Sequence, residues 1–225
     1  EEHTLIQVDK VFEYYDSLNQ PAQKVHFSWM SRGEPLANPY LTRLKDYSIF
    51  EALGKRALDR NLFPRFTVST ILPKCIEGQD LTELFPLIYP DIYYSIYSMN
   101  PNFRKKWLPN ALPAEEGLDM LVDYQNKTRK ILKLHWSFIK GENDDEQTLE
   151  NICKAVKARN LRVDVNIVRY NPFSELLGEE PDEEIIKRNY HLLREALPIE
   201  SAIKVVSRVG RDVFGSCGMF YPKEK

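Results

Sequence analysis

The chain has 225 residues, of which 43% are hydrophobic and 28% are charged, and its formal net charge is −2. These proportions are typical of a globular protein with a sizeable core, and they provide no overall positive field of the kind that attracts nucleic acids. No apolar run is long enough to cross a membrane, and the first ten residues carry no hydrophobic signal region. Three widely spaced cysteines form no disulfide framework, so we expect a cytoplasmic location. Because the sequence starts with Glu1 rather than Met, we expect it to begin inside a longer gene product.

Predicted helices and strands alternate along the chain. In chain order, the apolar spacing and the turn residues predict a helix at 5–18, a strand at 24–30, a helix at 41–60, a strand at 65–71, a short helical segment at 82–90, a strand at 91–99, a helix at 113–128, a strand at 130–139, a helix at 146–160, a strand at 161–170, a helix at 181–197 and a sixth strand at 201–209. This alternation predicts a parallel sheet with helical crossovers.

The polar residues that follow the predicted strands are the candidates for a binding site. In a barrel the carboxyl ends of the parallel strands meet, so these residues would converge on one pocket. Taken singly, Glu34 can also be read as a solvated loop acid, and the hydroxyl groups can be read as caps of the next turn. The candidates, in chain order, are Gly33, Glu34, Ser69, Thr70, Ser95, Tyr97, Ser98 and Asn171.

A second candidate feature is the C-terminal stretch "GRDVFGSCGMFYPKEK", in which Cys217 lies between small residues. Small neighbours let the backbone turn tightly and let a bulky partner come close. Read alone, a single cysteine is more often structural, and we expect Cys75 and Cys153 to be structural.

Six short motifs resemble one enzyme family in their order and spacing: "GEPLAN", "VST", "YSIYS", "KGEND", "NPF" and "GRDVFGSCGMF". The family is that of the radical-SAM RNA methyltransferases, more narrowly the enzymes that methylate carbon 2 of an adenine in large-subunit rRNA and in some tRNAs, along with their carbon-8 relative. The similarity runs from about Gln7 to Phe220. It implies an open, TIM-like α/β barrel of five or six parallel strands with outer helices and with the first strand missing. Residues 1–225 would then form one incomplete radical-SAM barrel domain that includes the C-terminal methyl-carrier cysteine segment.

The resemblance also implies roles for the candidate residues. In this family one S-adenosyl-L-methionine methylates a cysteine, and a second is cleaved to a radical that activates the methyl group for delivery to the base. Cys217 resembles that methyl-carrying cysteine, and Gly33 and Glu34 resemble the pair that holds the methionine amino group of the cofactor. The other positions that match cofactor-binding residues of the family are Ser69, Ser95, Ile96, Tyr97 and Asn171.

The sequence departs from the family at the iron–sulfur cluster. A [4Fe–4S] cluster of this kind needs three cysteines in a C-x3-C-x2-C loop, and this sequence has no such loop. The cluster and its electron donor are therefore expected only with the full-length protein. Tyr97 stands where the family usually has His, and Val206 and Val209 stand where Arg is common, which leaves the RNA substrate open between rRNA and tRNA.

RNA contacts must come from local basic patches. Arg104, Lys105 and Lys106 lie between two aromatic residues, a pattern that suits phosphate contact and base stacking, although a solvated surface run has the same appearance. The sequence "NKTRKILK" is a second basic cluster that more simply reads as a solvated face.

The sequence is compatible with three functions. The main hypothesis is a fragment of a radical-SAM RNA methyltransferase, and the second is a cluster-free subunit that binds the cofactor or RNA without catalysis of its own. The third is an unrelated barrel enzyme such as a lyase or aldolase, for which no strand end carries an obvious catalytic Lys or a Gly-rich phosphate loop. Since the missing first strand would leave strand 24–30 unpaired on one side, we also expect self-association through this edge, or cover by the chain's own terminus.

Overall fold

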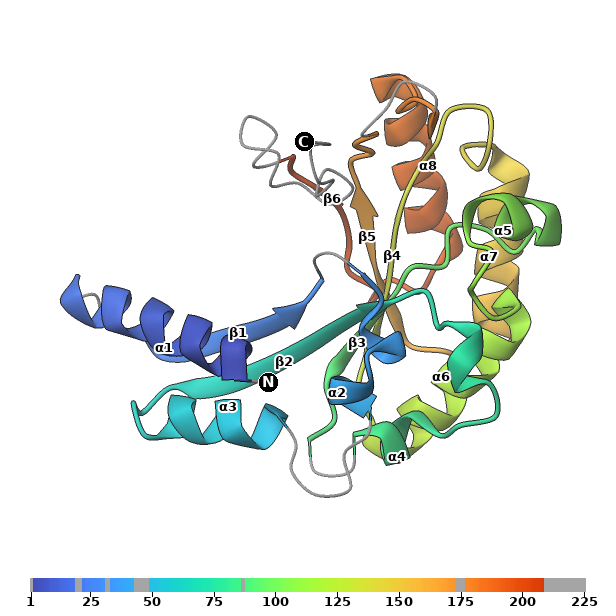
Figure 1. Ribbon diagram of the computed structural model, residues 1–225. Coiled ribbons are helices and arrows are strands. Elements are labelled where there is room, and N and C mark those ends of the chain that lie inside the picture. The colour runs from blue at the N-terminus through green and yellow to red at the C-terminus, as the bar shows by residue number, and fades with distance from the viewer. Residues whose placement is uncertain are drawn as a thin grey trace, which may run out of the picture.

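Within the part of the chain that the structure describes, the sheet contains six parallel strands, which pair in the same order in which they occur along the chain. The structure is a computed structural model that describes residues 2–18, 22–30, 33–42, 49–85, 88–172 and 177–208. Figure 1 shows a curved, open sheet with helices along its outer side, so the predicted open, TIM-like half-barrel is confirmed. The strands are β1 (Lys24–Trp29), β2 (Phe63–Thr70), β3 (Asp91–Tyr94), β4 (Leu132–Ser137), β5 (Val163–Val168) and β6 (Ile203–Val206).

The helices connect successive strands and supply the apolar layer outside the sheet. Thr148 N donates a hydrogen bond to the Asp145 carboxylate at 2.9 Å. Asp145 thereby caps the first turn of the helix after β4, a position at which Asp favours the start of a helix. The α-helices are α1 (Glu2–Ser17), α2 (Pro39–Thr42), α3 (Ile49–Leu58), α4 (Leu81–Leu84), α5 (Pro101–Trp107), α6 (Ala114–Thr128), α7 (Glu146–Ala158) and α8 (Glu183–Ala196), and the 3-10 helices are η1 (Pro35–Ala37) and η2 (Lys74–Ile76). Among the described residues, no helix combines the length and the apolar character needed to cross a bilayer.

The two faces of the sheet differ in polarity. On β4, Leu134 and Trp136 are each 1% exposed, whereas the alternate residues Lys133 and His135 are only half-buried. Because side chains alternate between the faces of a strand, the apolar set faces the helices and the polar set faces the inside of the half-barrel. The strand register places Ser69, Tyr93, Lys133 and Asp164 in one row across this inner face. The concave side is therefore polar, as a binding surface requires.

The structure differs from the prediction at β3 and in the segment that follows it. The strand predicted at 91–99 ends at Tyr94, because the next residues turn: Ile96 N donates to Tyr94 O at 3.0 Å, and Ser98 N donates to Ile96 O. Helix α5 was not predicted, although Asn100 caps it and Pro101 begins it. Residues 43–48 of the helix predicted at 41–60, and residue 209 at the end of the sixth strand, lie outside the described residues.

Candidate functional site

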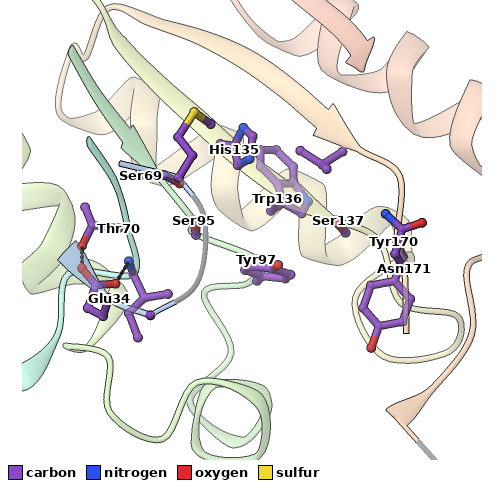
Figure 2. A pocket seen from close by; sticks show the side chains of 14 residues that line it. Glu34, Ser69, Thr70, Ser95, Tyr97, His135, Trp136, Ser137, Tyr170 and Asn171 are labelled. Carbon is purple, nitrogen blue, oxygen red and sulfur yellow. Dashed lines mark hydrogen bonds between the residues drawn. The ribbon is translucent and has the colours of Figure 1, made fainter. Parts of the chain in front are cut away.

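A pocket of about 200 Å³ lies at the carboxyl ends of β2, β3, β4 and β5 (Figure 2). In the figure Glu34 lies at one end of it and Asn171 at the other, with Ser95 and Tyr97 between them. Parallel strands bring their carboxyl ends to one edge, which is why residues so distant in sequence meet here. Six of the seven predicted cofactor-binding residues line this pocket: Gly33, Glu34, Ser69, Ser95, Tyr97 and Asn171.

Glu34 is the carboxylate of the pocket, and its orientation is fixed by neighbouring donors. Its Oε1 accepts hydrogen bonds from Leu36 N at 3.0 Å and from Thr70 Oγ1 at 2.6 Å, and its Oε2 accepts one from Ile71 N at 3.0 Å. Glu34 thereby caps η1 and ties the loop after β1 to the end of β2. A carboxylate offers about four acceptor positions. The side chain is therefore held in place and can still accept a hydrogen bond from a cationic ligand.

Two backbone positions at the pocket have left-handed conformations. Gly33 has φ = 91°, and a Cβ atom there would meet nothing within 4 Å, so its conformation rather than crowding favours glycine. Tyr97 has φ = 54°, which is uncommon for an aromatic residue. Its ring lines the pocket and stacks on Phe103, with ring centroids 6.4 Å apart and planes at 23°. The loop after β3 is therefore a strained segment that carries a pocket residue.

Ile96 is the predicted site residue that the structure places elsewhere. Its side chain is 0% exposed and belongs to the hydrophobic core. Its backbone N–H donates to Tyr94 O, and its carbonyl accepts a hydrogen bond from Arg104 Nη1 at 2.8 Å. The side chain of Ile96 therefore packs behind the pocket, between Ser95 and Tyr97, which line it, and contact of Ile96 with a cofactor stays a prediction.

The rim of the pocket after β5 is organised by one carboxylate. Glu180 accepts two hydrogen bonds from Arg169, at 2.9 and 2.8 Å, one from Tyr170 N at 2.8 Å and one from Arg208 at 2.7 Å. Arg208 also donates to Tyr170 O at 3.1 Å. Since Tyr170 and its neighbour Asn171 line the pocket, Glu180 links this rim to the chain that leaves β6.

His135 also lines the pocket and is not among the residues predicted from the sequence. It lies on β4, paired in register with Asn166 of β5, and its ring lies 5.8 Å from that of Tyr93. Burial, together with the positive charge of Lys204, lowers the pKa of His135 to about 4, so the imidazole is neutral at neutral pH. Among the described residues, its buried Nδ1 has no hydrogen-bond partner. The only sequence signal was its alternation with Leu134 and Trp136, which marks the inner face of the strand.

The predicted RNA contacts separate into different groups. Arg104 is 6% exposed, and its guanidinium donates to Ile96 O at 2.8 Å and to Leu112 O at 2.6 Å. It therefore holds backbone together and presents no cation to RNA, which corrects the expectation for this residue. Lys106 forms an ion pair with Glu142, while the neighbouring Lys105 is exposed.

The cysteines do not provide a cluster site within the described part of the chain. Cys75 is exposed and belongs to η2, whereas Cys153 is buried on α7, where burial raises the pKa of its thiol to about 11. Among the described residues, no group of three His, Cys, Asp or Glu side chains is placed to hold a metal ion. Cys217, the predicted methyl carrier, lies outside the described residues.

The fold and the pocket define a class: an open α/β half-barrel with a polar site at the carboxyl ends of its parallel strands. A crystal structure of a radical SAM methyltransferase from Sphaerobacter thermophilus shares this fold, with a TM-score of 0.75 and 22% identity, over 96% of this chain and 60% of that one.

Sequence relatives give the more particular assignment. A probable dual-specificity RNA methyltransferase RlmN from Clostridioides difficile is 30% identical over 201 residues, which cover 87% of this chain and 54% of that protein. A probable dual-specificity RNA methyltransferase RlmN 2 from Protochlamydia amoebophila is 24% identical over 97% of this chain and 58% of its own length. No protein-family model matches the sequence. The chain is thus homologous to RlmN-type methyltransferases, as the motifs predicted, and it spans about half the length of these relatives.

Proposed function

We propose that this chain is the cofactor-binding part of a radical-SAM RNA methyltransferase, which transfers a methyl group to an adenine ring carbon of rRNA or tRNA through a methylated Cys217. The names of the sequence relatives support the reaction class and an RNA substrate. The observation that carries the proposal is the pocket itself, because Glu34, Ser95 and Asn171 come from three strand ends and line one cavity. Residues 1–225 would form an incomplete barrel domain of this enzyme, located in the cytoplasm.

The described residues fit S-adenosyl-L-methionine as a ligand. The fixed carboxylate of Glu34 would hold the methionine amino group, since an ammonium group is a strong donor to a carboxylate. The hydroxyl groups of Ser69 and Ser95 and the amide of Asn171 would bind the polar groups of the ribose and adenine. When bound, the cofactor supplies the methyl group, while these side chains only orient it.

The described residues do not fit an iron–sulfur cluster. Three thiolates must converge on such a cluster, and Cys75 and Cys153 lie on different elements with different exposure. A cluster would therefore belong to the part of the relatives that this chain does not span, and its electron donor would be a separate partner. The same cysteine positions favour the second candidate function, a subunit that binds cofactor or RNA without catalysis of its own.

The position of Arg208 supports a role for Cys217 at this pocket. The guanidinium of Arg208 is bound to Tyr170 O at the pocket rim, and Cys217 follows nine residues later in the sequence. Nine residues span at most about 30 Å when extended. The chain between Arg208 and Cys217 is therefore long enough for the thiol to reach the pocket rim, as the proposal requires.

Titration calorimetry with S-adenosylhomocysteine tests the cofactor site. Replacing Glu34 by Gln removes the charge at constant size, and a charge-assisted hydrogen bond contributes about 1.5–3 kcal/mol, so the affinity should fall by about tenfold or more. Glu142→Gln removes the same charge outside the pocket and should bind like the wild type. Wild-type protein that does not bind the ligand, or equal affinities for Glu34→Gln and wild type, would contradict the assignment.

The two candidate functions differ in the fate of Cys217. The chain can be coexpressed with the part of an RlmN relative that it does not span. If the chain belongs to a methyltransferase, mass spectrometry should then detect a methyl group on Cys217. An unmodified Cys217 in a complex that holds an assembled cluster would favour the non-catalytic subunit.

A further inference from the structure

One buried amide connects two walls of the pocket from behind. Asn143, in the loop between β4 and α7, is 0% exposed. Its Nδ2 donates to Tyr97 O at 3.0 Å and to Ser137 O at 3.2 Å, and its Oδ1 accepts from Ile139 N at 2.7 Å. Tyr97 and Ser137 both line the pocket, but Tyr97 lies in the loop after β3 and Ser137 is the last residue of β4. Both amide hydrogens of Asn143 are thus used to hold the loop after β3 against the end of β4.

The loop after β3 needs such support because its backbone is strained. The left-handed conformation of Tyr97 costs of the order of 1 kcal/mol or more, and the hydrogen bonds within the loop join residues only two apart. Strained backbone persists only where its surroundings over-determine it. Here the carbonyls of Ile96 and Ser98 accept hydrogen bonds from Arg104, and the carbonyl between them accepts one from Asn143.

We infer that Asn143 is a positioning residue that fixes the orientation of Tyr97 and Ser137 for binding of an adenosine-containing ligand. This inference rests on the proposed function, because it concerns the same pocket. Asn143 acts only through its neighbours, since it is fully buried and is not itself part of the pocket lining. The hydrogen bond from its carboxamide to Tyr97 O fixes the position of the Tyr97 ring relative to the ends of the strands.

A second buried amide provides a matched control. Asn189 on α8 is also 0% exposed, and its Nδ2 donates to Asp144 O at 2.9 Å. Its Oδ1 accepts hydrogen bonds from Arg188. None of these three residues lines the pocket. A change at Asn189 therefore reports on the general cost of altering a buried amide in this region.

The test compares Asn143→Asp with Asn189→Asp in the whole chain. Asn143→Asp keeps the acceptor for Ile139 N but replaces both donor contacts with repulsion between oxygen atoms. Amide hydrogen exchange, followed by mass spectrometry, should become faster in residues 95–100 of Asn143→Asp and stay unchanged there in Asn189→Asp. By calorimetry, S-adenosylhomocysteine should bind Asn143→Asp about tenfold more weakly, while Asn189→Asp stays near the wild-type affinity.

Each outcome decides the inference. Exchange in residues 95–100 and affinity that match the wild type in Asn143→Asp would overturn it, as would equal losses in the two variants. If the wild type itself does not bind the ligand, the proposed cofactor site fails, whereas the exchange comparison still decides whether Asn143 holds the loop. If Asn143→Asp does not fold, Asn143→Ser and Asn189→Ser replace the pair, because serine keeps one donor.

Discussion

At the scale of single residues, His135 couples folding to pH. Its pKa in the folded protein is about 4, compared with about 6.5 for an exposed histidine, because burial and Lys204 disfavour the charged form. Between these values the unfolded chain binds more protons than the folded chain. Stability therefore falls as pH decreases through this window and is restored as pH rises to about 6.5. Burial also lowers the pKa of His26, which adds to the same trend.

The variant His135→Gln should lose part of this pH dependence. A pKa difference of this size corresponds to at most about 3 kcal/mol between the two ends of the window, and a residual slope from His26 should remain. Urea denaturation of wild type and variant from mildly acidic to neutral pH measures the effect. His191→Gln, an exposed change on α8, is the control. Parallel pH profiles for wild type and His135→Gln would show that this imidazole is not the group responsible.

Much of the candidate site could be predicted from a rule about single positions. Polar residues that directly follow parallel strands lie close together in the folded protein. Glu34, Ser95 and Asn171 were found in this way, because the carboxyl ends of strands lie at one edge. His135 was missed because it lies within a strand, where a polar residue looks the same whether it faces solvent or a pocket. Arg104 was misassigned because a basic run does not reveal which of its members points inward.

At the scale of elements, α5 illustrates the limit of sequence patterns. The helix is short, and its stability depends on tertiary contacts such as the stacking of Phe103 between Tyr97 and Trp107. The longer elements had clear apolar periodicity, so α6, α7, α8, β2 and β5 were predicted close to their observed bounds. The early end of β3 could not be predicted, because it depends on bonds from Arg104 and Asn143, which come from other elements.

Helix α5 gives a prediction of its own. Arg104→Met should destabilise the protein by about 2–4 kcal/mol, because several buried carbonyl groups lose their donor. Lys105→Met, the adjacent exposed change, should alter stability by less than about 0.5 kcal/mol. Urea denaturation of both variants makes the comparison. A neutral effect of Arg104→Met would mean that the guanidinium is not structural and would reopen its assignment to RNA binding.

At the scale of the whole molecule, β1 is an edge of the sheet, since it pairs only with β2 among the described strands. Exposed apolar side chains also lie on the preceding helix, where Val11 is 52% exposed and Tyr14 is 60% exposed. An open strand edge pairs readily with another chain. This open edge fits the comparison with the relatives, since the matched part is only 54% and 58% of their length.

We expect the isolated chain to self-associate through this edge. Sedimentation velocity over a wide range of protein concentration should show a reversible shift toward dimers or larger species. Val11→Lys combined with Tyr14→Lys should reduce the association, since like charges would meet at the contact. A wild-type chain that stays monomeric at every concentration would contradict this expectation.

The order of the strands also bears on how the protein is made. Because each strand pairs with the one synthesised just before it, a nascent chain leaving the ribosome can add every new strand to an edge that already exists. None of the described strands depends on a pairing partner from a distant later part of the chain, and such local pairing favours rapid folding. The cavity is the exception, since its walls extend from Met30 to Asn171 and are complete only after residue 171 has been translated.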